Sequence, residues 1–387
     1  MKRLVIFKGH RLILSGGNIP GLGMTEVKKT LLLLVTILLL FCEGRAFGGS
    51  IIAWGNNMFG QCDVPWPNSG FVAVASHDFH SLGLKSDGSI VGWGSHSSGE
   101  CTVPLPNKDF MAVATGESCS LGLKSNGSIV AWGWNYYGQC DVPSPNSGFV
   151  AITAGWYHCL GLKSDGSIVG WGRNTDGQCN VPAPNSGFVA IAAGYYHSMG
   201  LKSNGTIVAW GWNGDGQCDV PSPNTGFVEI AAGYYHSMGR KFDGTIVAWG
   251  GWNEYGERTV PSPNADFVEI SAGGYHSMGR KSNGSIVVWG WNIDGQCSVP
   301  SPNTDFMGIA GGWRHSLGLA VILIPGDFDN NGWVNFADFA VLASAWRSQP
   351  GQPNWNSACD ISNPKDNIIN RLDLDVFVEN WLKSVQP

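Results

Sequence analysis

The chain has 387 residues, of which only 13% are charged, while glycine (55 residues) and tryptophan (18 residues) are abundant. This composition suits short strands joined by tight turns and disfavours a helical protein, because glycine supplies turn positions with positive φ. The formal net charge of −6 argues against a nucleic-acid-binding protein, which needs a surplus of lysine and arginine to neutralise phosphates.

Residues 1–48 carry a targeting signal. Lys28 and Lys29 precede an apolar run over residues 31–41, and small and polar residues follow at positions 43–46. This order is typical of a secretory signal peptide, and the run is too short to favour a membrane span. We therefore expect a secreted or cell-surface protein with no membrane insertion after signal removal. We expect translation to begin at Met24, just upstream of the two lysines. An uncleaved membrane anchor is the alternative.

Residues 49–321 consist of a 39-residue repeat with one Trp-Gly pair per unit. The pairs begin at Trp54, Trp93, Trp132, Trp171, Trp210, Trp249 and Trp289, and the last interval has one extra residue. In the unit that starts at Gly187, the apolar runs 188–192, 197–202 and 206–210 are of strand length. Asn204-Gly205 predicts a type I′ hairpin turn between the second and third runs. Each unit is therefore expected to form a three-stranded antiparallel meander, with a short fourth strand as an open alternative.

The ends of the repeat array predict a closed ring. Residues 49–54 supply only the third strand of a unit, and residues 306–319 supply only the first two. A sheet of this size cannot bury its own faces, so neighbouring units must stack. We predict an all-β seven-bladed propeller in which the N-terminal strand completes the last blade.

The repeats share the pattern A-G-x-x-H-S-x-G-L-K-x-[DN]-G-[ST]-I-V-x-W-G-x-N-x-x-G-Q. Over residues 49–321 this pattern resembles the regulator of chromosome condensation repeat superfamily. The short unit is more similar to the secreted β-lactamase-inhibitor propeller of that superfamily than to the longer repeats of the nuclear exchange factor. The resemblance implies a seven-bladed propeller, and in the resembled inhibitor loop aromatics on one face grip the partner protein. It leaves function open, because propellers host many functions.

Histidine and cysteine each recur once per unit. The histidines are His80, His158, His197, His236, His276 and His315, with Cys119 in the remaining unit. We expect each to make a hydrogen bond that holds a strand end, in preference to a shared metal site. The cysteines are Cys62, Cys101, Cys140, Cys179, Cys218 and Cys297, with Arg258 in the odd unit. We interpret them as small apolar fillers, because equivalent positions in adjacent blades should be too far apart for disulfides. A bridge between Cys119 and Cys159 is an alternative that the sequence does not favour.

The residues just before the repeated histidine vary and are often aromatic. Because they follow the first strand of each unit, they should gather at one end of the propeller, where Tyr, Trp and Arg are typical of recognition surfaces. Some of them could instead pack between blades. The predicted partner-binding residues are Phe79, Trp156, Tyr157, Tyr195, Tyr196, Tyr234, Tyr235, Tyr275, Trp313 and Arg314. A second set follows the Trp-Gly pairs, namely Trp134, Trp212, Trp252 and Trp291.

A linker at 322–326 leads to residues 327–387, which are acidic and compatible with helices. Residues 327–338 place oxygen ligands at the spacing of a calcium loop, with Gly332 at the sharp turn. The predicted ligands are Asp327, Asp329, Asn331, the Trp333 carbonyl, Asn335 and Asp338. A polar turn without metal is the alternative.

A second copy of the calcium loop follows, with a two-residue insertion and fewer carboxylates. Its predicted ligands are Asp360, Ser362, Asp366, the Ile368 carbonyl, Asn370 and Asp373. We expect two calcium ions, the second held more weakly. A helix is predicted after each loop, at 338–346 and 373–381, and none before the first, which argues against an ordinary EF-hand.

The duplicated loop and helix resemble a type I dockerin over residues 326–384. The resemblance implies calcium-dependent docking onto cohesin modules of extracellular scaffolds that often carry polysaccharide-degrading enzymes. Residues 336–337 and 371–372, where the family tends to carry recognition residues, are Phe-Ala and Arg-Leu here, so this chain departs from the family at its partner-reading positions.

The sequence contains no nucleophile–base pair, paired carboxylates or phosphate loop that would indicate an enzyme. We therefore predict an exported, non-catalytic recognition protein whose propeller binds a protein or glycan and whose tail anchors it through calcium. An accessory component of extracellular polysaccharide degradation is one alternative. A guanine-nucleotide exchange factor is another, and the signal segment, the short repeats and the acidic balance oppose it.

Overall fold

The computed structural model describes residues 48–321 without a gap. Beyond them it describes 336–345, 348–350, 352, 356, 359–361, 368–370 and 373–378. The predicted signal segment up to residue 47 and the linker at 322–326 therefore lie outside the described residues.

The repeats form seven three-stranded antiparallel sheets, which we number as blades 1 to 7. Blade 1 comprises β2 (Phe71–Ser76), β3 (His80–Lys85) and β4 (Ile90–Gly94). Blades 2 to 4 comprise β5 (Phe110–Thr115), β6 (Cys119–Lys124), β7 (Ile129–Gly133), β8 (Phe149–Ala154), β9 (His158–Lys163), β10 (Ile168–Gly172), β11 (Phe188–Ala193), β12 (His197–Lys202) and β13 (Ile207–Gly211). Blades 5 and 6 comprise β14 (Phe227–Ala232), β15 (His236–Lys241), β16 (Ile246–Gly250), β17 (Phe267–Ala272), β18 (His276–Lys281) and β19 (Ile286–Gly290).

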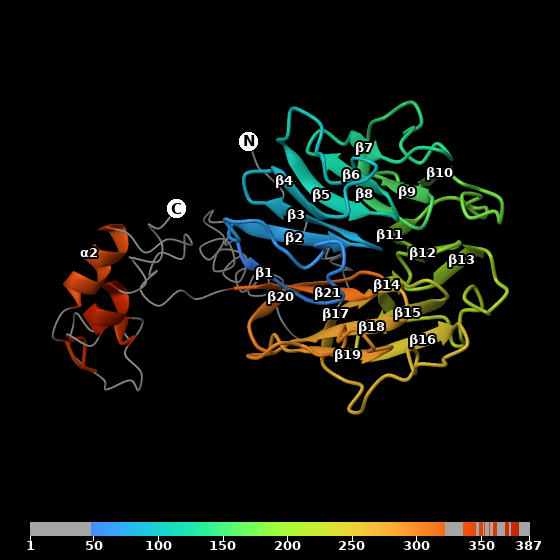
Figure 1. Cartoon of the computed structure of the whole chain (residues 1–387). Coiled ribbons are helices and arrows are strands. Elements are labelled where there is room, and N and C mark those ends of the chain that lie inside the picture. The colour runs from blue at the N-terminus through green and yellow to red at the C-terminus, as the bar shows by residue number, and fades with distance from the viewer. Residues whose placement is uncertain are drawn as a thin grey trace, which may run out of the picture.

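Blade 7 is built from both ends of the repeat array. It joins β20 (Phe306–Gly311) and β21 (His315–Ala320) to the N-terminal strand β1 (Ser50–Gly55). Strand β1 pairs antiparallel with β21 over its whole length, and Figure 1 shows this blue strand beside the orange strands of the last repeat. The predicted closure of the propeller is confirmed.

The glycine in the middle of each second strand packs against the phenylalanine that opens the first strand, and in blades 1 to 6 the lysine that ends the second strand does so too. In blade 1 the Phe71 ring lies so close to Gly83 that a Cβ there would be 2.4 Å from it, which explains the glycine. Lys85 Nζ lies 4.3 Å from the Phe71 ring centroid and donates to the Pro67 carbonyl at 2.9 Å. The lysine therefore covers the open side of the ring with a cation–π contact.

The tryptophan of each Trp-Gly pair ties its blade to the preceding repeat. Trp93 Nε1 donates to the Gln61 carbonyl at 2.9 Å, and the other six tryptophans make the equivalent bond. The indole also lies in an apolar cluster that spans two blades, where Trp93 and Phe71 of blade 1 meet Leu317 of blade 7. The core therefore lies between blades, as expected for sheets that cannot bury their faces alone.

The hairpin turns differ from the type I′ turn predicted at Asn204-Gly205. Only Gly205 has a positive φ (79°), and its amide donates to the Lys202 carbonyl at 2.9 Å. The Asn204 side chain instead accepts bonds from the Thr206 amide and hydroxyl. This is the three-residue hairpin form, in which a turn with ordinary φ values precedes a glycine. The prediction was wrong because the Asn204 side chain stabilises the turn through its hydrogen bonds, so the Asn204 backbone does not need a positive φ.

Two short helical segments are described near the C-terminus. Helix α2 (Phe336–Ser344) begins two residues before the helix predicted at 338–346, and residues 373–378 are also helical. They pack together through Phe339 and Phe377, whose ring centroids are 5.9 Å apart. None of the helices within the described ranges is both long and apolar enough to cross a membrane.

Candidate binding face

The connections between first and second strands meet at one end of the propeller, and we call them the axial loops. They are residues 77–79, 116–118, 155–157, 194–196, 233–235, 273–275 and 312–314. Loops of neighbouring blades are hydrogen-bonded to one another: Gly274 N donates to the Gly312 carbonyl at 3.0 Å, and Trp313 N donates to the His77 carbonyl at 3.3 Å. The predicted gathering of these residues at one end follows from this arrangement.

Four of the predicted residues form a stacked aromatic floor. Trp156 stacks on Tyr195 with ring centroids 4.0 Å apart, and Tyr195 contacts Tyr234 at 4.6 Å. Trp313 lies nearly parallel to Tyr234 at 6.4 Å. Tyr234 is itself buried, and its hydroxyl donates to Asp78 of blade 1. Tyr234 therefore supports the floor, as the alternative of packing between blades predicts for part of this set.

The other predicted aromatics lie outside the floor and contact the residues that follow the Trp-Gly pairs. Ring-centroid distances of 4.7 to 6.2 Å join Tyr157 to Trp134, Tyr196 and Tyr235 to Trp212, Tyr275 to Trp291, and Phe79 to Phe59. Three of the four tryptophans in the second predicted set therefore belong to the same end as the axial loops. The fourth, Trp252, is 75% exposed and donates to Asp215.

The loops that follow the Trp-Gly pairs, which we call the outer loops, carry several exposed apolar residues that were not predicted from the sequence. They stand four to six residues after the Trp of the Trp-Gly pair and are Met58, Phe59, Tyr136, Tyr137, Tyr255 and Ile293. We call these six residues together with Trp252 the rim. They differ from repeat to repeat, so periodicity does not find them. Their signal is local, since large apolar side chains stand in loops that are otherwise polar.

Acidic and basic groups lie among these rings. Near the floor, His77 Nδ1 is 3.1 Å from Asp78 Oδ1, and burial raises the pKa of Glu117. Arg173 lies 4.5 Å from the Tyr196 ring centroid, a cation–π distance. Arg314, a predicted partner-binding residue, lies 4.3 Å from the Trp291 ring and pairs with Asp294 at 3.0 Å.

Below the axial loops, the repeated histidines form a ring of hydrogen bonds between blades. The pairs are His80–Ser120, His158–Ser198, His197–Ser237, His236–Ser277, His276–Ser316 and His315–Ser81, with N···O distances of 2.9 or 3.0 Å. The prediction of one hydrogen bond per histidine is confirmed, and the partner lies in the next blade.

The serine partner determines which ring nitrogen of each histidine carries the proton. Each serine hydroxyl donates to the backbone carbonyl that also accepts from the blade's tryptophan, so the histidine Nε2 must carry the proton it gives to the serine. Burial lowers the pKa of these imidazoles from 6.5 to about 3, and to about 4 for His236. The histidines are therefore neutral structural groups at physiological pH. Over the described parts of the chain, no three His, Cys, Asp or Glu side chains are grouped to hold a metal ion.

The predicted calcium ligands are only partly within the described residues. Asp327, Asp329, Asn331, Trp333, Asn335, Ser362 and Asp366 lie outside them, and Asp338 is placed only as part of helix α2. In the second loop Asp360 and Asp373 are buried. The Asp373 carboxylate accepts bonds from Ile361 N at 2.7 Å and Asn370 N at 2.9 Å, so the last position of that loop lies beside the backbone that follows Asp360.

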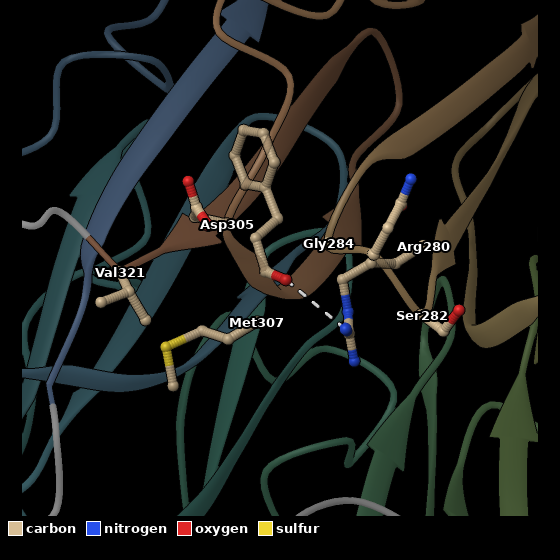
Figure 2. A pocket seen from close by; sticks show the side chains of 8 residues that line it. Arg280, Ser282, Gly284, Asp305, Met307 and Val321 are labelled. Carbon is tan, nitrogen blue, oxygen red and sulfur yellow. Dashed lines mark hydrogen bonds between the residues drawn. The ribbon is translucent and has the colours of Figure 1, made fainter.

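A pocket between blades 6 and 7 lies at the opposite end of the propeller, where the second and third strands of each blade are joined. Figure 2 shows Arg280 beside Ser282 and Gly284 on one side and Met307 on the other. Arg280 is already engaged, since it donates to Glu269 at 2.8 Å and to the Phe306 carbonyl at 3.4 Å. This pocket therefore offers no set of convergent free groups.

Five repeats match the family profile described as the Regulator of chromosome condensation (RCC1) repeat, at residues 112–139, 149–178, 188–217, 227–257 and 267–296. A similar solved structure is Prp20p from Saccharomyces cerevisiae, studied for its binding to Gsp1p and histones (18% identity, 74% of this chain and 94% of that chain, TM-score 0.63). Human WBSCR16 (17%, 71% and 99%, 0.57) and the ectodomain of the Arabidopsis thaliana receptor kinase ACR4 (22%, 65% and 93%, 0.54) are also similar. These likenesses show the propeller fold. No curated protein sequence matches the chain.

Proposed function

We propose that this chain, a propeller of RCC1-type repeats, is an exported, non-catalytic binding protein that recognises a partner protein through the aromatic floor and rim. The observation that carries the proposal is the run of ring contacts from Trp134 through Trp156 and Tyr195 to Trp313. Rigid aromatic side chains offer large contact areas at a low entropic cost, which is why they dominate binding hot spots.

The arrangement of exposure supports a binding role. The floor is held by stacking and by the Tyr234–Asp78 bond, so it is ordered before a partner arrives, and pre-organisation lowers the cost of binding. The rim residues Tyr136 and Trp252 are 76% and 75% exposed, which leaves their apolar area for a partner to bury. Prp20p, which shares this fold, binds proteins. Neither the polysaccharide-degrading nor the exchange-factor alternative gains a specific observation from the described residues.

The rim gives the first test. The double variant Tyr136→Ala/Trp252→Ala should weaken binding at least tenfold, because hot-spot truncations cost about 2 kcal/mol or more. The matched control is Phe242→Ala, which removes an exposed aromatic (87%) from a hairpin turn at the other end. Immobilised wild-type chain and both variants are compared for capture of proteins from the extracellular fraction of the source cells, with a glycan array alongside.

The proposal requires a protein that wild type and Phe242→Ala retain and the rim variant loses. Equal capture by all three chains would contradict it, and retention of glycans alone would replace the protein partner with a carbohydrate. Equal melting temperatures of the three chains serve as the folding control.

We further propose that the two C-terminal loops bind calcium and that the loaded tail attaches the protein to an extracellular partner of the cohesin type. Asp360 and Asp373, the first and last ligand positions of the second loop, are brought to the same place by the Ile361–Asp373 bond, as a closed ligand loop requires. Carboxylate, amide and backbone carbonyl oxygens are the ligands that calcium prefers.

Calcium titration tests the tail. Isothermal titration of the metal-free chain should give two binding events, and Asp327→Ala/Asp329→Ala should remove the tighter one. Chelator should reduce the helical circular dichroism of the tail, because binding energy is folding energy in small metal-binding domains. Asp375→Asn, an exposed acidic position outside the loops, is the control and should keep both events. Unchanged dichroism and no heat of binding would reject the assignment.

A further inference from the structure

The ring of histidine–serine bonds is interrupted once, between blades 2 and 3. At this interface Cys119 of β6 occupies the histidine position and Cys159 of β9 occupies the serine position. Both partners of one link are therefore replaced together, while the other six links keep their histidine and serine. Two independent replacements would have no reason to fall on the same interface.

The two thiols occupy the places that the histidine and serine fill at the other interfaces. Cys159 Sγ donates to the Gln139 carbonyl at 3.5 Å, as the serine does in the other blades. The Cys119 and Cys159 side chains lie in the same apolar cluster, and both are fully buried. The two thiols therefore lie at the same interface between blades, shielded from solvent.

We propose that Cys119 and Cys159 are a disulfide site that staples blade 2 to blade 3. The two thiols lose two protons and two electrons as the S–S bond forms. The oxidant is a small disulfide such as oxidised glutathione, which accepts the electrons and protons through a mixed disulfide and leaves as two thiols.

The other repeated cysteines do not compete for this bond. Those of the loops each direct their sulfur to a backbone carbonyl of their own loop, for example Cys140 Sγ to the Trp134 carbonyl at 3.4 Å and Cys101 Sγ to the Ser95 carbonyl at 2.9 Å. They also stand one per blade, as predicted for positions too far apart to pair. Cys140 packs against the cluster that holds Cys119 and Cys159, but it is only partly buried, whereas Cys119 and Cys159 are fully buried within it.

Burial determines when the bond can form. Exchange needs a thiolate, and burial raises the pKa of the Cys159 thiol well above 9. Oxidation of the closed propeller should therefore be slow, and the bond should form while blades 2 and 3 dock during folding. Once formed, it should resist reductants that cannot enter the interface.

Refolding the full chain in a glutathione redox buffer tests the site. Peptide mapping without reduction should recover a cross-linked pair containing Cys119 and Cys159, with Cys140 and Cys179 alkylated. The oxidised chain should melt roughly 5–10 °C above the reduced chain, because the cross-link restricts the unfolded chain. Alkylation of both Cys119 and Cys159 in the refolded oxidised chain would overturn the proposal.

The chain offers its own control variant. Cys119→His/Cys159→Ser restores the link found at the other six interfaces, so it should fold and melt at the same temperature in oxidised and reduced buffer. Cys140→Ser should keep the redox-dependent shift. A shift that persists in the His/Ser variant would place the bond elsewhere and reject this assignment. The outcome is independent of the proposed binding function, because it measures only thiols and melting.

Discussion

Acidification from pH 7 to pH 4.5 is expected to unfold the propeller. The six buried histidines have pKa values of about 3 to 4 in the folded chain, against about 6.5 when unfolded. Between these values the unfolded chain binds protons that the folded chain excludes. The histidines' contribution to stability is therefore fully present above pH 6.5 and is lost as the pH falls towards 4.

The size of this effect follows from the number of histidines. Each contributes at most about 1.4 kcal/mol per pH unit, so six give a slope of up to about 8 kcal/mol per pH unit, against a total stability of about 5–15 kcal/mol for typical domains. The physical reason is visible at Nδ1, the atom that would take the proton. In His197, His276 and His315 this buried atom has no hydrogen-bond partner among the described residues, so a new N–H would lack an acceptor.

Denaturant unfolding at pH 7.5, 6.5, 5.5 and 5.0 measures the slope. His197→Gln removes one titrating group and should lower the slope by about one sixth. His96→Gln is the matched control, because His96 lies exposed in an outer loop and bonds only to the Gly94 carbonyl two residues away. A stability that stays level from pH 7.5 to pH 5 would show that the histidine ring is not the acid-sensitive element.

The sequence predicts the propeller well because its spacing is regular. The Trp-Gly interval determines the blade count, and the incomplete units at the two ends determine the closure between β1 and β21. The same regularity hides the partner of each histidine. Ser81 follows His80 directly, but His80 bonds to Ser120 of the next repeat, and a periodic sequence cannot distinguish the two.

The candidate binding face was predicted in part, for a related reason. The axial-loop aromatics stand at a fixed place in the repeat, next to the histidine, so their position can be read from the sequence. The rim residues Tyr136 and Ile293 occupy loop positions that vary between repeats, and only the three-dimensional structure shows that they surround the same end. Tyr234 stands at the same repeat position but is buried and bonds to Asp78, three blades away around the ring, which the sequence alone does not reveal.

Removal of strand β1 is expected to have the largest effect of any local change. A chain that begins after Gly55 loses every backbone pair with β21, the Trp54 Nε1 bond to the Gln296 carbonyl, and the buried side chains of Ile51 and Trp54. Deleting two large buried side chains alone costs about 5–10 kcal/mol, which is comparable to the whole stability of a domain. We expect the truncated chain to lose its cooperative melting transition.

The truncation also exposes a hazard that the intact ring avoids. Without β1, strand β21 presents unpaired amides and carbonyls along an edge, which is a template for association between chains. The control is a chain that starts at residue 48, which keeps β1 and should melt like the full propeller. A circular permutant that moves residues 48–57 behind Val321 through a Gly-Ser linker should restore folding, because β1 then pairs with the strand that precedes it. If the truncated chain melted cooperatively at the wild-type temperature, six complete blades would be stable without ring closure. That result would contradict the conclusion that the blades depend on one another through their shared cores.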